Sequence, residues 1–243
     1  MTLALVAREL RHHYRVALGF RRREVLVGFD LELQAGSALG LVGPNGSGKS
    51  TFLTVASGVQ KPSSGQLQVL GGTPADAAVR RRIGYLPEDS PFPPELSALA
   101  ALELCGSIRG LRGRELRERS QAMLSRVGLG DQLRTPLGRF SRGMLRRFGL
   151  AQACLHEPEL LLLDEPTAGL DALGFDVLDE LLTEAHERGA ATIIATHLWN
   201  DVERQCDRLA IVAAGRVTAM GTPADVAGDA TTLLELYRRH GVA

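Results

Sequence analysis

The sequence predicts an α/β fold, and three observations lead to this prediction. Short apolar runs bounded by glycines alternate with a helical stretch in the first third of the chain. The same alternation of strands and helices returns from residue 160 onward, and a mostly helical stretch separates the two parts. Because strands that alternate with helices form sheets covered by those helices, we expect an α/β core interrupted by a helical insertion.

The first third of the chain is predicted to contain three strands and one helix. The apolar runs VLVGFDLEL (25–33), SALGLVG (37–43) and GQLQVLGG (65–72) end in glycines or lie next to them, as strands bounded by turns do. Between the second and third runs, SGKSTFLTVASGV (47–59) has the composition of a helix, and Gly58 closes it.

The middle of the chain changes character. Four prolines lie between residues 87 and 94, so this stretch is irregular. Leu, Ala, Ile and Met then recur at helical spacing from Leu99 to Val127, and a second helical stretch covers 142–158. We therefore divide the single domain into an α/β core with a β subdomain, residues 1–87 and 158–243, and a mostly helical insertion, residues 88–157.

The last third resumes the alternation of strands and helices. The elements that we expect are strands at 160–164, 191–197 and 208–217, and helices at 175–188, 199–206 and 231–240. The run LLLLD at 160–164 is apolar at four consecutive positions, which is typical of a strand buried on both faces of a parallel sheet.

Composition narrows the classes of function. The 243 residues are 44% hydrophobic, enough for one or two domains with a buried core, and the 28 basic residues equal the 28 acidic ones. The balanced charge gives no general attraction to nucleic acid or anionic lipid. Residues 8–23 are an exception, with six arginines and two histidines against one glutamate. Only two aromatic residues, Tyr14 and Phe20, lie there, so a solvated edge facing a partner is favoured over a DNA-binding arm.

Cysteines and hydropathy indicate the compartment. Cys105, Cys154 and Cys206 have no metal-ligand spacing, and we expect free thiols in a reducing compartment. No stretch approaches the ~20 apolar residues of a membrane span, and the N-terminus does not resemble a signal peptide. We therefore expect a cytosolic protein, unless a partner holds it at a membrane.

Residues 43–51, GPNGSGKST, match the phosphate-loop pattern at Gly43, Gly48, Lys49 and Ser50. A glycine-rich loop can turn its backbone N–H groups toward an anion, and the helix that follows adds its positive N-terminal end. A chance glycine-rich turn is the alternative, but here a strand precedes the loop and a helix follows it. We therefore expect a nucleoside triphosphate to be bound by Gly43, Pro44, Asn45, Gly46, Ser47, Gly48, Lys49, Ser50 and Thr51.

Two adjacent carboxylates, Asp164 and Glu165, end the apolar run at 160–164. Ligands bind at the carboxyl ends of strands in α/β sheets, so both acids are expected beside the phosphate loop. Asp164 together with the Ser50 hydroxyl would hold Mg²⁺, and Glu165 would orient and polarise the attacking water. A strand end with a helix cap explains one acid and leaves the second without a role.

Five motifs follow one another in the order found in ABC ATPase domains. They are GPNGSGKST at 43–51, FSRGM at 140–144, LLLLDE at 160–165, AGLD at 168–171 and TH at 196–197. The chain resembles the nucleotide-binding subunit of an ABC transporter over nearly its whole length. This resemblance implies a RecA-like P-loop NTPase core, an antiparallel β subdomain and a helical subdomain, with ATP and Mg²⁺ as cofactors.

The resemblance also implies a role for several residues. Two subunits face each other head to tail, most simply as a homodimer, and Ser141 and Gly143 contact the γ-phosphate of the ATP bound by the partner. His197 binds the γ-phosphate as a switch residue, and Asp171 links the two sites across the dimer. With Lys49 reaching the terminal phosphates and Glu165 acting on the attacking water, these residues form the expected catalytic group.

Two departures from the usual ABC pattern occur together. Arg142 replaces a glycine of the LSGGQ signature, and Glu88 stands where the family has a glutamine. We assign Glu88 as a metal ligand, with a surface glutamate in a proline-rich loop as the alternative. Both departures, together with IGYLPE at 83–88, resemble the ATPase subunits of ABC-2-type exporters, which favours export and leaves the cargo undetermined.

An aromatic side chain stacks on adenine in this family. Tyr14 is our candidate, and Phe20 is the alternative because it stands closer to the next strand. Stacking requires only a π-face, so we expect little selectivity for the base.

The resemblance implies partners and a location as well. A separate integral membrane permease would dock at the loop 88–96 and hold the chain at the cytoplasmic face of the membrane. A soluble mechanical ABC ATPase that acts on DNA or ribosomes is the alternative. The chain carries one phosphate loop, one signature and no sustained heptads, so we favour the transporter and expect no nucleic-acid partner.

Overall fold

A computed structural model describes residues 2–16, 21–89, 91–228 and 232–240 of the chain. Its strands are β1 (Leu3–Val16), β2 (Arg21–Gln34), β3 (Ala38–Val42), β4 (Ser64–Val69), β5 (Ile83–Leu86), β6 (Leu160–Asp164), β7 (Ala191–Thr196), β8 (Arg208–Ala213) and β9 (Arg216–Gly221). Its helices are α1 (Lys49–Ala56), α2 (Ala77–Arg80), α3 (Ala98–Arg109), α4 (Gly113–Arg126), α5 (Arg142–Cys154), α6 (Ala172–Glu187), α7 (Trp199–Gln205), α8 (Pro223–Ala227) and α9 (Leu233–Arg239). Two 3₁₀ turns, η2 (Gly130–Gln132) and η3 (Leu137–Arg139), lie between α4 and α5.

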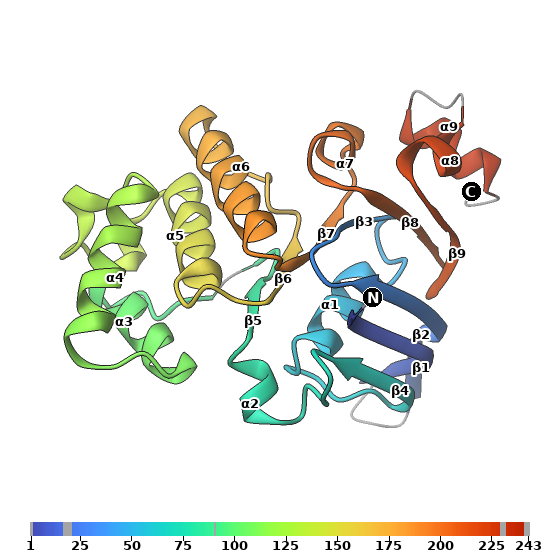
Figure 1. Ribbon diagram of the computed structural model, residues 1–243, viewed down its shortest axis with the longest axis horizontal. Coiled ribbons are helices and arrows are strands. Elements are labelled where there is room, and N and C mark those ends of the chain that lie inside the picture. Colours follow the sequence, from blue (N-terminus) through green and yellow to red (C-terminus); the bar gives the residue numbers. More distant parts are fainter. Residues whose placement is uncertain (1, 17–20, 90, 229–231, 241–243) are drawn as a thin grey trace.

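A six-stranded sheet with the order β5-β6-β7-β3-β8-β9 forms the centre of the molecule (Figure 1). The first five of these strands are parallel, and β9 pairs antiparallel with β8. The register places Val42 beside Thr196 and Asp164 beside Ala195. The loops that follow β3, β6 and β7 therefore leave the same edge of the sheet, and this edge carries the phosphate loop, the two acids and His197.

The strand β6 is buried on both faces, as its unbroken leucine run predicts. Leu160 and Leu162 belong to one hydrophobic cluster together with α1 and the three-stranded sheet. Leu161 and Leu163 belong to a second cluster together with α3, α5 and α6. Successive side chains of a strand point to opposite faces, so one strand contributes to both cores and holds its terminal acids between them.

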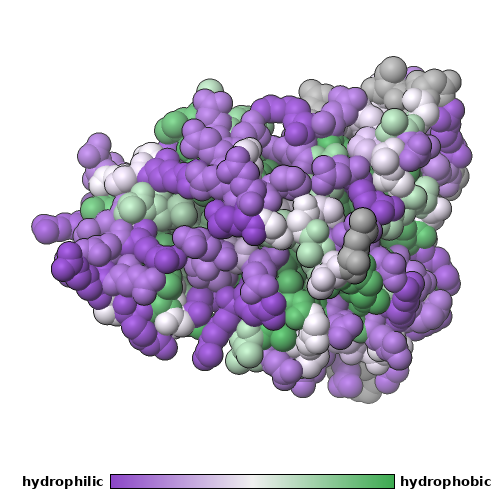
Figure 2. Space-filling model, in the orientation of Figure 1, coloured by the Kyte–Doolittle hydropathy of each residue, from purple (hydrophilic) through white to green (hydrophobic). Residues whose placement is uncertain are grey.

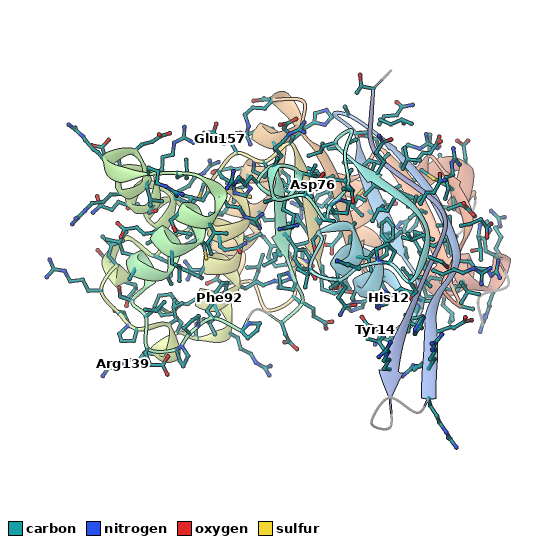
Figure 3. The ribbon with its side chains drawn as sticks, turned by 90° about the horizontal axis from the view of Figure 1, so that it is seen from below. His12, Tyr14, Asp76, Phe92, Arg139 and Glu157 are labelled. Atoms are coloured by element: carbon teal, nitrogen blue, oxygen red, sulfur yellow. The ribbon has the colours of Figure 1, made fainter. Side chains whose placement is uncertain are left out.

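A second sheet, with the order β2-β1-β4, is antiparallel. Its first strand was not expected, because the arginines between residues 8 and 23 hide the apolar pattern. Leu10 and Phe29 are fully buried partners across β1 and β2, whereas Arg8 and Arg11 are part of the polar face. The hairpin of β1 and β2 extends beyond the body of the molecule (Figure 3). The basic segment is therefore part of two paired strands with one buried face, which the charge pattern alone did not indicate.

Three helices, α3, α4 and α5, lie between β5 and β6 in the chain and form a layer at one end of the molecule (Figure 1). The predicted helix from Leu99 to Val127 is two helices, α3 and α4. Gly110 adopts φ 110° and ends α3, which a side chain with a Cβ would resist. At its other end Ser97 caps α3 by accepting a hydrogen bond from the backbone of Ala100.

The predicted strand at 208–217 is also two strands. Ala214 and Gly215 both have positive φ, 46° and 75°, and form the tight turn from β8 into β9. The N–H of Val27 in β2 donates to the Gly215 carbonyl, and the N–H of Gly215 donates to the Ser47 carbonyl of the phosphate loop. The turn therefore holds the second sheet against the loop at the end of β3.

The C-terminal helices cover β8. Leu209 and Ile211 of β8 pack in a third hydrophobic cluster with Val226 of α8 and Leu236 of α9. Each helix begins with a capping box, formed by Thr222 in α8 and by Thr232 in α9.

The visible face of the molecule is mostly hydrophilic, with hydrophobic residues in small patches (Figure 2). None of the described helices combines the length and the apolar character needed to cross a bilayer.

Candidate active site

The phosphate loop connects β3 to α1 and folds around its own lysine. The Lys49 ammonium donates hydrogen bonds to the carbonyls of Gly43, at 2.6 Å, and Pro44, at 3.3 Å. Lys49 is 6% exposed, and burial lowers its pKa against the opposing charges of Glu165 and Asp164. Gly48 has φ 114°, a conformation that only glycine adopts at little cost, and it turns the chain into the helix. The loop thus presents a compact cation beside the acids of β6.

Asp164 lies at the carboxyl end of β6 and is 2% exposed. Burial raises its pKa to about 6, and the Ser50 hydroxyl opposes this shift by hydrogen bonding to the carboxylate. The charges of Glu88 and Glu165 raise the pKa further. Its Oδ1 atom is buried and has no hydrogen-bond partner among the described residues. Such an orphaned carboxylate oxygen is costly unless a cation or a proton meets it.

The residues around Asp164 fit Mg²⁺. The Ser50 hydroxyl and the Asp164 carboxylate are hard oxygen ligands. Glu88 is a third oxygen donor, and its charge raises the pKa of Asp164. Among the described residues no cluster of three or more His, Cys, Asp or Glu side chains forms a metal site. A Mg²⁺ ion with few protein ligands is the usual arrangement when phosphate oxygens supply the others.

Glu165 turns away from the strand that carries Asp164. It has φ 48°, rare for a residue with a side chain, and its N–H donates to the Ala195 carbonyl of β7 at 2.8 Å. Its Oε2 lies 2.8 Å from Nδ1 of His197. The Glu165 side chain is 9% exposed and that of His197 is 58% exposed, so the pair joins a buried acid to an accessible imidazole. The sharp turn explains why two adjacent acids point in different directions.

A cavity of about 530 Å³ brings most of the predicted site residues together. Its walls are formed by Tyr14, Arg23, Val25, Asn45, Gly46, Gly48, Lys49, Ser50, Thr51, Glu88, Glu165 and His197. Four further predicted residues are not part of these walls: Gly43, Pro44 and Ser47 of the loop and Asp164 of β6. Arg23 and Val25 were not predicted, although Arg23 is the cross-strand partner of Tyr14.

Tyr14 forms the wall contributed by β1. Its hydroxyl lies 3.3 Å from Oγ1 of Thr51 in α1, and its ring meets that of His12 edge to face at 4.9 Å. Figure 3 shows both rings near the point where the hairpin leaves the body of the molecule. The alternative candidate, Phe20, lies outside the described residues.

Ser141 and Gly143 lie apart from this cavity. Ser141 caps α5 by accepting a hydrogen bond from the backbone of Met144 at 3.2 Å, so a capping role exists whatever the serine contacts otherwise. A Cβ on Gly143 would lie 3.2 Å from the Gly169 carbonyl, whereas the side chain of Arg142 is exposed. Arg142 and Gly169 line a different cavity of about 540 Å³, which Glu88 also borders.

Asp171 is the N-cap of α6. Its Oδ1 accepts a hydrogen bond from the backbone N–H of Gly174 at 2.9 Å and lies 3.7 Å from Nε of Arg147. Asp171 is an exposed residue and lies outside the cavity around Lys49. Within one chain it therefore acts on helix structure, and a role at the nucleotide needs a second chain.

A buried network that sequence reasoning missed supports the two loops of the site. Asp201 of α7 accepts hydrogen bonds from the hydroxyls of Thr167, at 2.8 Å, and Thr196, at 2.9 Å. Thr167 follows the acids of β6, and Thr196 precedes His197. An acid in the first turn of a helix next to His197 is the sequence signal, and alone it indicates only helix capping.

The chain is similar to known proteins of one family. The family model described as ABC transporter matches residues 26–168. The chain is 37% identical to the uncharacterized ABC transporter ATP-binding protein sll0415 of Synechocystis sp., over 91% of this chain and 63% of that protein. It is 34% identical to the linearmycin resistance ATP-binding protein LnrL of Bacillus subtilis, over 85% and 67%. It is also 34% identical to the Nod factor export ATP-binding protein I of Cupriavidus metallidurans, over 82% and 66%. The chain thus spans about two thirds or less of the length of these curated relatives, with 63% for the first.

Solved structures extend the likeness to the whole fold. One described as the ATP binding subunit of an ABC transporter has a TM-score of 0.87 and 31% identity, covering 99% of this chain and 100% of that one. The dimeric post-hydrolysis state of the ATP-binding cassette MJ0796, bound to ADP and Pi, has a TM-score of 0.81 and 25% identity, covering 90% and 98%. The fold and the site define an ATP-binding cassette domain. The chain belongs to the ABC transporter family.

Proposed function

We propose that the chain binds ATP with Mg²⁺ and hydrolyses it to ADP and phosphate, and that this hydrolysis drives a separate membrane permease. The observation that carries this proposal is the pairing of Glu165 with His197, 2.8 Å apart, in the cavity that the phosphate loop also lines. A buried general base, an accessible imidazole and a cation in one cavity match the requirements of phosphoryl transfer to water.

Each residue of the cavity has a defined task on this proposal. Lys49 exchanges its bonds to the Gly43 and Pro44 carbonyls for bonds to the terminal phosphates, which the N–H groups of residues 43–51 cradle. Ser50, Asp164 and Glu88 would hold Mg²⁺, which neutralises charge on the phosphates when bound. Glu165 orients the attacking water and accepts its proton, and His197 hydrogen bonds to the γ-phosphate. Tyr14 stacks on the base.

We also propose that two copies bind two ATP molecules between them as a homodimer. Ser141, Gly143 and Asp171 lie outside the cavity of their own chain, and Ser141 is exposed at the start of α5. The dimeric form of the MJ0796 cassette supports this arrangement. In the dimer Ser141 and Gly143 contact the γ-phosphate held by the partner, and Asp171 links the two sites.

The partner in the membrane is proposed to be a permease of the ABC-2 exporter type. The relatives named for linearmycin resistance and for Nod factor export support export as the direction of transport. The chain would then lie at the cytoplasmic face of the membrane, held there by its permease. This proposal includes no nucleic-acid partner, and the soluble mechanical ATPase is kept as an outcome of the test.

We divide the chain into a core, residues 1–87 and 158–243, and a helical part, residues 88–157. The permease is proposed to dock where the core meets the helical part. We assign docking to the loop 88–96, which precedes α3. Replacing Glu95 and Leu96 together is expected to abolish stimulation by the permease and to leave basal ATP hydrolysis within about twofold, because neither residue lines the nucleotide cavity.

Affinity purification tests the proposal as a whole. The tagged Glu165→Gln variant is isolated from detergent-solubilised membranes with ATP present, because it is expected to bind ATP without completing hydrolysis. A membrane protein with several spans, recovered in near-equal amount and identified by mass spectrometry, is the expected result. Recovery of ribosomal or DNA-repair proteins, or of the ATPase alone, would contradict the transporter and favour the soluble alternative.

A further inference from the structure

Arg146 is a buried cation that the functions described above do not use. It is the fifth residue of α5, the helix that begins after Ser141, and it is only 7% exposed. A guanidinium does not lose its charge in a protein, so burying it is unfavourable unless all of its N–H groups find acceptors. The question is therefore which acceptors it has.

Five backbone carbonyls meet the five N–H groups of this guanidinium. Nη1 donates to the carbonyls of Pro87, at 2.8 Å, and Glu88, at 3.1 Å. Nε donates to the carbonyl of Pro166 at 3.3 Å. Nη2 donates to the carbonyls of Asp164 and Glu165. The side chain is thus saturated by backbone groups from two loops.

These two loops carry the acids of the site. Pro87 and Glu88 follow β5. Asp164 ends the neighbouring strand β6, and Glu165 and Pro166 follow it. The buried cation attracts the carbonyl oxygens of both segments and so holds them around one side chain. One side chain of α5 therefore fixes the backbone on both sides of the candidate metal ligands and the general base.

The electrostatics agree with the geometry. Burial lowers the pKa of Arg146, and the carboxylates of Asp164, Glu165 and Glu88 oppose this shift through their charges. The neighbouring Arg147 is buried as well, but its Nη1 donates to the carbonyls of Val127 and Gly128 within the helical layer. Two adjacent buried arginines thus have different contacts. Arg147 lies 3.7 Å from Asp171 at the start of α6, whereas Arg146 donates to the carbonyls at the ends of β5 and β6.

We propose that Arg146 is a positioning residue for hydrolysis: it sets the backbone that aims Asp164, Glu165 and Glu88, and it ties that backbone to the helix that begins at the signature. This inference rests on the proposed ATP hydrolysis. Arg146 does not line the nucleotide cavity, so its loss acts on the chemical step and spares ATP binding. A movement of α5 on contact with a partner would reach the acids directly.

Two variants of Arg146 and one control test this. Arg146→Gln removes the charge and most donors, while Arg146→Lys keeps the charge but has three donors and no planar fork. Arg109→Gln is the matched control, because Arg109 of α3 donates to the Arg80 carbonyl away from the site. Hydrogen exchange of the backbone amides at 164–165, 167–168 and 88–89 is measured beside kcat, KM and ATP affinity.

Both Arg146 variants are expected to exchange these amides at least about tenfold faster and to lower kcat by at least about tenfold, with KM within about threefold. The control changes neither. A structural role alone would lower the unfolding midpoint and leave exchange at the two loops and kcat of the folded protein unchanged, which would overturn the proposal. If Arg146→Gln does not fold, Arg146→Lys decides alone.

The two kinds of readout separate this inference from the proposed function. Wild-type protein that binds ATP without hydrolysing it would refute the proposed function, whereas hydrogen exchange would still show whether Arg146 anchors the two loops. If the wild type does hydrolyse ATP, unchanged exchange in the Arg146 variants would refute only the positioning role.

Discussion

Nδ1 of His197 lies 2.8 Å from Oε2 of Glu165, so the exposed imidazole of one strand end meets the buried carboxylate of the next. The two residues follow β7 and β6, which are adjacent in the sheet. An ionised carboxylate only accepts hydrogen bonds, so the imidazole donates through its Nδ1–H. This hydrogen bond holds the carboxylate in place before any phosphate arrives.

His197→Ala is expected to lower the rate of ATP hydrolysis by about 10²-fold or more, because the general base loses its neighbour and the γ-phosphate loses a hydrogen bond. ATP affinity is expected to stay within about threefold, since residues 43–51 are untouched. Steady-state hydrolysis and equilibrium binding of a fluorescent ATP analogue check both expectations. His186→Ala, at an exposed site on α6, is the control. Hydrolysis at the wild-type rate in His197→Ala would show that His197 has no role in the reaction.

Tyr14→Ala is expected to weaken ATP binding by about fivefold or more, because stacking of one base on an aromatic ring contributes roughly 1–3 kcal/mol. Tyr14→Phe keeps the ring and loses only the hydroxyl contact with Thr51, so its affinity should stay near that of the wild type. Stacking does not read the edge of the base, so ATP and GTP should be affected alike. Wild-type affinity in Tyr14→Ala would show that Tyr14 does not stack on the base, and Phe20→Ala would then be measured.

Asp201→Ala is expected to destabilise the protein by about 2 kcal/mol, because the hydroxyls of Thr167 and Thr196 lose their buried acceptor. Urea unfolding followed by circular dichroism measures this. Asp176→Ala, which removes an exposed acid from α6, is expected to change the free energy of unfolding by less than about 0.5 kcal/mol. Equal effects of the two substitutions would show that the network is not a source of stability.

His156 predicts a pH dependence of stability. Burial, together with the charge of Arg109, lowers the pKa of His156 to about 4, and the ring lies 3.2 Å from the Ile83 carbonyl. Between pH 4 and the ordinary value of 6.5 the unfolded chain binds more protons at this site, so stability rises with pH across this window. Acidification from pH 6.5 to 4 should therefore cost on the order of 2 kcal/mol at this residue.

Unfolding measured across this pH window checks the contribution of His156. The variant His156→Gln should lose less stability on acidification than the wild type does. The exposed His186→Gln should behave as the wild type. An identical pH dependence in all three proteins would exclude His156 as the origin of the effect.

Those parts of the fold that depend on local pattern could be predicted from the sequence. The phosphate loop follows from glycines between a strand and a helix, and the burial of β6 on both faces follows from its four leucines. The proximity of the acids of β6 to the phosphate loop was inferred from the two motifs. The registers of β3 with β7 and of β6 with β7 place these strand ends at one edge of the sheet.

Other features depend on tertiary contacts that no local pattern contains. The strand β1 was missed because its arginines lie on the solvent face and its apolar residues on the other, with a bulge near Leu10 that disrupts the alternation. The arginine at position 146 reads as a surface residue of a helix, and only the fold brings five carbonyls to it. The same holds for Asp201, whose partners lie up to 34 residues away.

The measurement that tests the central claim most directly compares ATP hydrolysis by the wild type and by Glu165→Gln, with Mg²⁺ present and ATP binding measured on the same samples. Glutamine keeps the shape of the side chain but cannot accept the proton of the attacking water. We predict Mg²⁺-dependent hydrolysis by the wild type and a rate at least about 10²-fold lower in the variant. The ATP affinities of the two proteins should lie within about threefold of each other. Hydrolysis at equal rates in both proteins, or no hydrolysis by the wild type, would contradict the assignment of this site.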